Sequence, residues 1–189
     1  MYLFSYQPPH RILYNSFQNQ SFFKFDFLNF TFCRKMKRHI TFDQVKQLIE
    51  STAPEINKWK PEVILAIGGG GYVPSRYLRN FIDCHLVGVS IQLYKEDETQ
   101  HEDGPKVIQW LDHNSLEFMK GKKILIVDEM DDTRRTLSYV VNRLRNEGFS
   151  ELGVFVLHDK KKEKPALDVE KYWSGEKIDA RIWVVYPWE

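Results

Sequence analysis

The chain has 189 residues, a formal net charge of +1 and two cysteines, Cys33 and Cys84. Its length suits one domain with a sizeable core, and its balanced charge predicts that it does not bind nucleic acid. Two cysteines supply neither a disulfide framework nor a cysteine-rich metal site, so a reducing, cytoplasmic setting is expected. The sequence has no uninterrupted apolar run of about 18 residues, which predicts that no helix crosses a membrane.

The first 35 residues differ in composition from the rest of the chain. This segment is rich in Asn, Gln and Ser, and the stretch 21–32 holds six phenylalanines. It lacks the apolar core of a secretory signal peptide, and its few arginines and Asp26 argue against a mitochondrial presequence. We therefore predict that residues 1–35 are an unstructured extension or that Met36 is the true first residue, and that the functional domain spans residues 36–189.

Apolar patterning after Met36 predicts alternating helices and strands. Thr41 is placed to cap a helix over 42–51, and a buried strand is expected over 62–67. That strand is followed by a run of four glycines, Gly68, Gly69, Gly70 and Gly71. Such a run lets backbone N–H groups approach an anion, although a tight turn alone would also explain it. It matches neither a dinucleotide-binding fingerprint nor a Walker loop, so by itself it identifies no ligand.

The remaining pattern continues the alternation. Pro74 suits a first helical turn, Tyr77 and Phe81 are expected on the apolar side of that helix, and Gly148 is expected to end a later helix. The predicted order is helix, strand, polar loop, strand, helix, strand and strand, at 74–82, 86–94, 95–106, 122–127, 137–144, 152–157 and 181–186. This order predicts an α/β fold with a parallel sheet that helices cover on both faces.

The strand at 122–127 leads directly into a dense run of carboxylates. The run holds Asp128, Glu129, Asp131 and Asp132, and it is followed by Thr133, Arg134, Arg135 and Thr136. Carboxylates crowded at the carboxyl end of a buried strand repel one another unless a cation or polar ligand compensates. We expect Asp131 to be solvated and the other three acids to face a ligand.

These residue types suit a sugar phosphate. Carboxylates accept hydrogen bonds from sugar hydroxyls or hold Mg²⁺ with its waters, and a Thr-bracketed turn at a helix N-terminus can surround a phosphate. An acidic first turn that complements a helix dipole would explain one or two acids, but not four beside two arginines. The sequence therefore predicts a ligand site at this end of the sheet.

The run from Val127 to Thr136 resembles the binding motif for phosphoribosylpyrophosphate (PRPP) in type I phosphoribosyltransferases. In that motif an apolar strand, paired acids and two further residues precede Asp-Thr-x-x-Thr. The order of glycine turn, polar loop, acidic motif and basic–aromatic C-terminal segment is also similar to that family, over residues 40–189. The ending Trp183 to Glu189 resembles the ending of the enzymes that act on xanthine and guanine.

The resemblance implies a parallel-sheet fold with a small C-terminal hood, mainly residues 158–189. It also implies a Mg²⁺-dependent enzyme of purine salvage. Such an enzyme transfers the phosphoribosyl group of PRPP to a 6-oxopurine, meaning xanthine, guanine or hypoxanthine, and releases a nucleoside 5′-monophosphate and pyrophosphate. Relatives of this kind are commonly homodimers or homotetramers.

The resemblance further implies roles for the residues that match the PRPP motif. Asp128 and Glu129 would bind the ribose hydroxyls, with Mg²⁺ held in part by Asp128, and Asp132 would be the general acid or base near purine N7. Asp131 lies within the same motif. The turn from Thr133 to Thr136, with Arg134 and Arg135, would hold the 5′-phosphate, and the four glycines would contact pyrophosphate.

Purine recognition is implied for the C-terminal part. Lys160 would donate to the 6-oxo oxygen, Trp183 would stack on the base, and the backbone of Val184 would meet the 2-position. Glu189 would help to order a second Mg²⁺, and residues 95–109 would form a lid. A lysine suits a 6-oxopurine because the amino group of adenine would leave two donors facing each other.

Some features depart from the family pattern or leave alternatives open. The family commonly has glycine at the position of Arg134, which would place its cation beside the phosphate or fold it outward. Any lysine between Lys160 and Lys164 could reach the base, although we expect Lys161, Lys162 and Lys164 to be a solvated loop. His158 is expected to be a structural histidine. The competing functions are transfer to another base, and a regulatory protein that binds PRPP or nucleotides without turnover.

Overall fold

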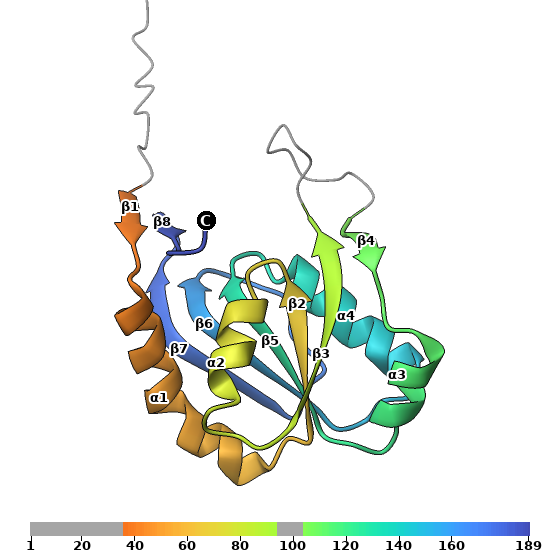
Figure 1. Ribbon diagram of the computed structural model, residues 1–189. Helices are drawn as coiled ribbons and strands as arrows, with labels where there is room; N and C mark the ends of the chain where they lie inside the picture. Colours follow the sequence, from red (N-terminus) through yellow and green to blue (C-terminus); the bar gives the residue numbers. More distant parts are fainter. Residues whose placement is uncertain (1–35, 94–103) are drawn as a thin grey trace, which may run out of the picture. The chain divides into compact units, whose positions relative to one another are not determined.

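A six-stranded, mostly parallel sheet forms the centre of the domain (Figure 1). The computed structural model describes residues 36–93 and 104–189, so the predicted N-terminal extension and most of the polar loop lie outside the described residues. Only the pairing of β3 with β4 is antiparallel. In spatial order the strands are β4 (Lys106–Gln109), β3 (His85–Gln92), β2 (Val63–Gly68), β5 (Ile124–Asp131), β6 (Leu152–Lys161) and β7 (Lys171–Asp179).

Four helices cover the two faces of this sheet: α1 (Phe42–Trp59), α2 (Tyr72–Leu78), α3 (His113–Met119) and α4 (Arg135–Asn146). Successive residues of β2 and β5 alternate between two apolar cores, as a period of two requires. Ile64 and Leu125 belong to the core under α1 and α2, and Leu65 and Ile126 belong to the core under α3 and α4. This three-layer arrangement confirms the predicted α/β fold.

The order of the strands places the glycine turn beside the acidic run. β2 pairs with β3 on one side and with β5 on the other, so the direction of the crossovers reverses between β2 and β5. Ligands of open α/β sheets bind at this kind of switch point, outside the carboxyl ends of the strands. Ala66 is opposite Val127, which brings the ends of the two strands together.

Helix α1 is longer than predicted. Thr41 caps it as expected, in a reciprocal capping box with Gln44. The helix nevertheless continues past Pro54 to Trp59, because Ala53 and Ile56 are buried on the same side as the residues of its first half. Burial of this face outweighs the backbone hydrogen bond that a proline removes.

Other boundaries and burials also differ from the sequence prediction. β5 runs to Asp131 instead of residue 127, because Met130 and Asp131 continue to pair with β6. Phe81, expected in the core, is 38% exposed, because α2 ends at Leu78. The elements β1, β4, α3 and β7 were not predicted, since they are short or carry too few apolar residues in a clear period.

A separate two-stranded sheet lies near the C-terminus. Residues 158–161 and 171–179 of the predicted hood belong to β6 and β7 of the central sheet, so the name hood is kept below for the small sheet and the residues after it. β8 (Ile182–Val185) pairs in parallel with β1 (Met36–His39) and not with the central sheet. The first described residues of the chain therefore complete a structure whose other strand lies almost at the C-terminus. The exposed, basic sequence of β1 gave no sign of this pairing.

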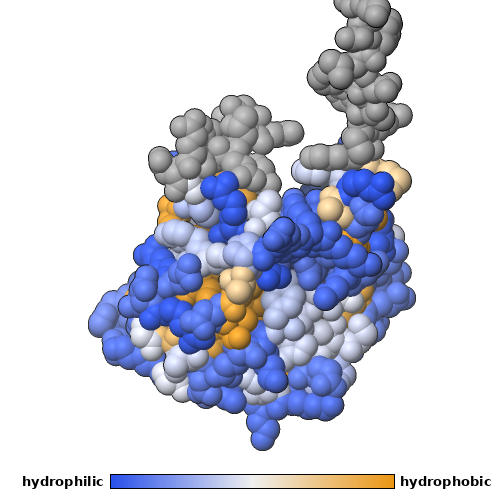
Figure 2. Space-filling view, turned by 180° about the vertical axis from the view of Figure 1, so that it is seen from behind, coloured by the Kyte–Doolittle hydropathy of each residue, from blue (hydrophilic) through white to orange (hydrophobic). Residues whose placement is uncertain are grey.

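The face of the molecule shown in Figure 2 is mostly hydrophilic, and its apolar residues form separate areas. Among the helices in the described part of the chain, none has the length and apolar character that crossing a membrane requires.

Candidate active site

The glycine turn is tightly packed against its neighbours at three of its four positions. A Cβ atom added at Gly71 would lie 2.4 Å from the carbonyl oxygen of Ile67 and 2.5 Å from that of Val127. A Cβ atom at Gly70 would lie 1.9 Å from the carboxyl carbon of Glu129. At Gly68 it would meet the ring of Tyr72, whereas at Gly69 there is open space within 4 Å. The absence of side chains thus lets the turn lie directly against the acidic run.

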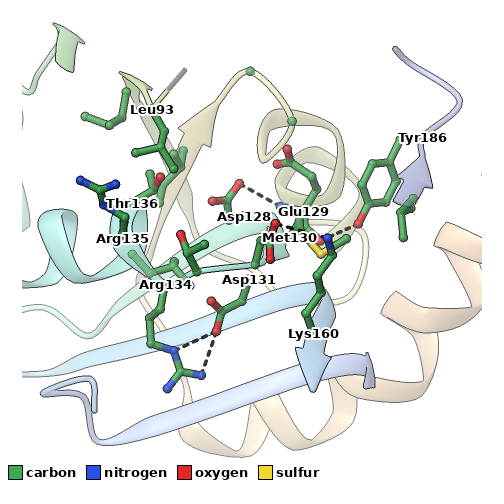
Figure 3. Close-up of a pocket in the computed structure, with 18 of the residues that line it drawn as sticks. Leu93, Asp128, Glu129, Met130, Asp131, Arg134, Arg135, Thr136, Lys160 and Tyr186 are labelled. Atoms are coloured by element: carbon green, nitrogen blue, oxygen red, sulfur yellow. Dashed lines mark hydrogen bonds and ion pairs between the residues drawn. The ribbon is translucent and has the colours of Figure 1, made fainter. Parts of the chain in front are cut away.

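The first two acids of the run are linked through the main chain. The backbone N–H of Glu129 donates to Oδ1 of Asp128 at 2.9 Å, as Figure 3 shows. Burial, followed by the negative charge of Glu129, raises the pKa of Asp128 well above its ordinary value. Oε2 of Glu129 is buried and has no hydrogen-bond partner within residues 36–93 and 104–189. The two carboxylates are therefore held in a place where a cation or a hydroxyl donor would relieve their electrostatic cost.

Asp131 is buried rather than solvated, which corrects the sequence prediction. It is 1% exposed and accepts hydrogen bonds from Nε of Arg134 at 2.9 Å and from the Tyr172 hydroxyl at 2.8 Å. Nζ of Lys164 lies 3.2 Å from its Oδ2 atom and also pairs with Asp159. The sequence predicts that Lys164 belongs to a solvated loop. In the structure its side chain is instead a buried partner of two acids.

Arg134 folds away from the turn that it belongs to. Its backbone is left-handed, with φ 65° and ψ 2°, which explains why glycine suits this position. In Figure 3 its guanidinium turns toward Asp131, and it lies 5.0 Å from the centre of the Tyr172 ring. A hydrogen bond to the carbonyl of Pro165 adds to this anchoring. Of the two alternatives left by the sequence, the structure shows the outward one.

The turn between Asp132 and the first residues of α4 leaves a helix N-terminus facing the cavity. Thr133, Arg135 and Thr136 all line that cavity, and α4 begins at Arg135. The first N–H groups of a helix have no partner within it and carry partial positive charge. Together with the threonine hydroxyls they form the kind of site that binds a phosphate.

Asp132 lies between two lysines from the end of β6 and the residues after it. Nζ of Lys160 is 3.2 Å from its Oδ2 atom, and Lys162 pairs with its Oδ1 atom. Burial raises the pKa of Asp132, but the two lysines outweigh that effect and hold it below its ordinary value. Asp132 is therefore a carboxylate that can accept a proton. Lys162 is exposed, as expected, and does not line the cavity, but it pairs with Asp132 from its edge.

The hood closes the other side of the cavity. Nζ of Lys160 lies 5.8 Å from the centre of the Trp183 ring, and the next residue, Val184, is buried. Burial raises the pKa of the Glu189 side chain, and the negative charge of Glu129 adds to the effect. An aromatic ring and an ammonium group on one side of a cavity can recognise a flat base with a carbonyl oxygen.

A cavity of about 330 Å³ collects nearly all of the predicted site residues. Gly71 is the one predicted residue that does not line it, because its role is to pack against the backbone. The predicted site did not include six further residues that line the cavity: Ile67, Ile91, Leu93, Met130, Leu137 and Tyr186. Tyr186 belongs to the C-terminal motif, but its contact with the acidic run depends on the tertiary fold. The predicted lid at 95–109 lies mostly outside the described residues.

Comparisons with known proteins point to one family. Residues 37–189 match the model of the phosphoribosyl transferase domain. The chain is 33% identical over 190 residues to hypoxanthine-guanine phosphoribosyltransferase of Saccharomyces cerevisiae. This alignment covers 81% of the chain and 86% of the yeast protein. The chain is 34% identical over 187 residues to xanthine phosphoribosyltransferase 1 of the same yeast, covering 81% and 90%.

A solved structure is also similar. A hypothetical protein from Neisseria gonorrhoeae with bound ppGpp superimposes with a TM-score of 0.72 at 36% identity, covering 82% of this chain and 90% of that one. The family match covers residues 37–189, and the two yeast relatives are 33% and 34% identical to the chain over the aligned residues. The chain therefore belongs to the phosphoribosyltransferase family, and it has the type I fold of that family.

Proposed function

We propose that the chain is a purine phosphoribosyltransferase that joins a 6-oxopurine to PRPP in purine salvage. The observation that carries this proposal is the single cavity that holds three kinds of group at once. Paired acids suit a ribose, a helix N-terminus with threonines suits a phosphate, and Lys160 beside Trp183 suits a 6-oxopurine. The names of the yeast relatives, hypoxanthine-guanine and xanthine phosphoribosyltransferase, support the same substrate class.

In this proposal the acids act on the sugar. Asp128 and Glu129 accept hydrogen bonds from the ribose 2- and 3-hydroxyls, and the backbone of the glycine turn contacts pyrophosphate. The residues from Thr133 to Thr136 bind the 5′-phosphate. Loss of pyrophosphate from the anomeric carbon builds positive charge on the ribose, and carboxylates fixed nearby stabilise that charge.

Asp132 and the hood act on the base. Asp132, held as a carboxylate by two lysines, lies where it can accept a proton from a purine nitrogen. Lys160 then donates to the 6-oxo oxygen while Trp183 stacks on the ring. Lys162 remains beside Asp132 when Lys160 turns to the base, so the acid keeps one cationic partner.

The donor set also fits Mg²⁺. The raised pKa of Asp128 and the unpartnered oxygen of Glu129 mark an acidic position that a cation would relieve. Across residues 36–93 and 104–189 no three His, Cys, Asp or Glu side chains converge to hold a metal alone. This suits Mg²⁺, which commonly takes one or two carboxylates plus waters and substrate oxygens. Asp128 is the residue proposed to hold it, where it would neutralise charge on pyrophosphate, and Glu189 would help to order a second Mg²⁺.

A nucleotide-binding protein without turnover is the second candidate. The Neisseria structure, solved with bound ppGpp, is the observation that favours it. The residues proposed for transfer, apart from Gly71, nevertheless line one cavity together with Asp132, which supports an enzyme. Assembly into a homodimer or homotetramer and a cytoplasmic location stay predictions.

A base-selection assay tests the proposal. The purified full chain is incubated with Mg²⁺ and PRPP, and adenine, hypoxanthine, guanine and xanthine are offered separately. We expect nucleoside monophosphate and pyrophosphate from at least one 6-oxopurine and not from adenine. Turnover of adenine alone would contradict the 6-oxopurine assignment. Binding of PRPP without turnover of any base would favour the second candidate instead.

A further inference from the structure

A buried hydrogen-bonded chain connects the hood to the acidic run. The hydroxyl of Tyr186 donates to the backbone carbonyl of Glu129 at 2.8 Å, and Nδ1 of His158 lies 2.8 Å from the same hydroxyl oxygen. Tyr186 is 3% exposed and His158 is fully buried. Neither side chain has a part in the transfer chemistry proposed above. Figure 3 shows Tyr186 reaching from the hood to the acidic run.

The direction of the hydrogen bonds can be assigned. A tyrosine hydroxyl has one proton, and the carbonyl of Glu129 can only accept it. Both 2.8 Å contacts of the hydroxyl are hydrogen bonds only when Nδ1 of His158 donates to the Tyr186 oxygen, so we assign this tautomer to the neutral ring. Burial, with a further contribution from Arg38, lowers the pKa of His158 to about 4, although Glu176 opposes this shift. The ring is thus neutral near pH 7.

Glu176 and Arg38 lie on the other side of the His158 ring. Nε2 of His158 lies 3.6 Å from Oε2 of Glu176 and has no hydrogen-bond partner among the described residues. Both oxygens of Glu176 are taken by Arg38 of β1, at 2.7 and 2.9 Å. Because Arg38 compensates the carboxylate, Glu176 does not draw a second proton onto the ring.

The series of hydrogen bonds from His158 through Tyr186 ends at the backbone of Glu129, one of the two acids proposed to bind ribose. The N–H of Glu129 donates to Asp128 and its carbonyl accepts from Tyr186, so both polar groups of this residue's main chain are engaged. The Tyr186 ring is also stacked on Trp188, with centroids 4.8 Å apart and planes 8° apart. The ring would therefore keep its place without the hydroxyl, and only the link to Glu129 would be lost.

We propose that Tyr186, oriented by His158, is a positioning residue that couples the base-binding hood to the two acids that bind ribose. Trp183 and Val184 precede Tyr186 in the same segment, so a shift of the hood moves the group that holds Glu129. This inference rests on the proposed function, because it assigns a purpose to the same cavity. The hydroxyl acts through Glu129 and touches neither substrate.

Tyr186→Phe tests the link with the ring packing intact. We expect the affinity for PRPP, measured by titration calorimetry with PRPP and Mg²⁺ alone, to fall about tenfold, and kcat/KM for PRPP to fall about ten- to a hundredfold. The KM for the purine should change little, because Lys160 and Trp183 keep their places. Tyr139→Phe is the matched control, since its hydroxyl contacts Arg143 on α4 outside the cavity. It should behave as wild type.

A pair of His158 variants tests the orienting role without changing Tyr186. His158→Asn keeps an N–H donor near the place of Nδ1, whereas His158→Leu has none. We expect His158→Asn to retain most of the kcat/KM for PRPP and His158→Leu to resemble Tyr186→Phe. Equal rates in the two His158 variants would overturn the orienting role.

Two results distinguish failure of this inference from failure of the proposed function. Wild-type PRPP affinity and kcat/KM in Tyr186→Phe would overturn the inference and leave the proposed function standing. A wild-type chain that neither binds PRPP nor transfers its phosphoribosyl group would overturn the proposed function and the inference with it.

Discussion

At the scale of single residues, Asp132 is the side chain on which the proposed chemistry depends most directly. It is held between Lys160 and Lys162, and it accepts a proton only as a carboxylate. Asp132→Asn keeps the shape of the side chain but removes that capacity. We expect kcat to fall by about 10²- to 10⁴-fold, the range for loss of a general acid or base.

The same variant should fold almost as well as the wild type, because the Asp132 side chain is 30% exposed. Steady-state transfer rates and urea unfolding would be measured on the two proteins side by side. Wild-type rates in Asp132→Asn would show that the acid–base role belongs to another group.

The pair of Asp131 and Arg134 is expected to contribute to the stability of the fold and not to the transfer chemistry. Asp131→Ala would leave Lys164, Tyr172 and Arg134 without their shared buried partner. Removing one member of a buried charged cluster commonly costs about 3 kcal/mol or more. We expect a loss of that size in the free energy of unfolding, measured by urea denaturation.

Arg134→Gly should cost much less than Asp131→Ala. Glycine adopts the left-handed backbone of this position without strain, a gain of about 1 kcal/mol that offsets the lost ion pair. Lys164 and Tyr172 would still satisfy Asp131. A net change within about 1 kcal/mol is therefore expected, and a loss equal to that of Asp131→Ala would contradict this explanation of Arg134.

At the level of elements, the positions of the glycine turn differ in whether they matter for packing or for PRPP binding. A Cβ atom at Gly71 would meet two backbone carbonyls, which cannot move, so Gly71→Ala should lower the free energy of unfolding by about 2 kcal/mol. A Cβ atom at Gly70 would meet only the carboxyl end of the Glu129 side chain, which can swing away. Gly70→Ala should therefore fold well but bind PRPP poorly.

Gly69→Ala is the comparison for both variants, because open space surrounds this position. Thermal unfolding and PRPP titration of the three proteins would give two different orders of severity. The prediction fails if Gly69→Ala impairs PRPP binding as much as Gly70→Ala, or destabilises the fold as much as Gly71→Ala.

The elements themselves were predictable to different degrees. The strands β2, β5 and β6 are continuous apolar runs, and their existence followed from the sequence. Helix α1 was predicted too short because Pro54 is a local signal, whereas burial of Ile56 depends on the packed sheet. β1 could not be predicted, since its partner β8 lies more than 140 residues away in the sequence.

At the scale of the whole molecule, the two ends of the described domain depend on each other. β1 supplies the pairing partner of β8, and Arg38 supplies the cation that compensates Glu176. Removal of residues 1–35 should leave activity intact, because the family match begins only at residue 37. Removal of residues 1–40 should cost both stability and activity, because it takes away β1 and the buried Ile40.

Thermal unfolding and transfer assays on the two truncated proteins would check this boundary. An inactive 1–35 deletion would show that the N-terminal segment takes part in the function. A fully active 1–40 deletion would show that the hood does not need β1.

The α/β class, the resemblance to the family and most residues of the cavity were predictable from the amino-acid sequence. Apolar runs, glycines and carboxylates are local signals, and the PRPP motif is continuous from Val127 to Thr136. Only the tertiary structure decided which charges are paired. Asp131 and Lys164 are buried partners, Arg134 folds outward, and Tyr186 reaches the acidic run. The physical reason is that pairing depends on distances between strands far apart in sequence, and no local pattern records those distances.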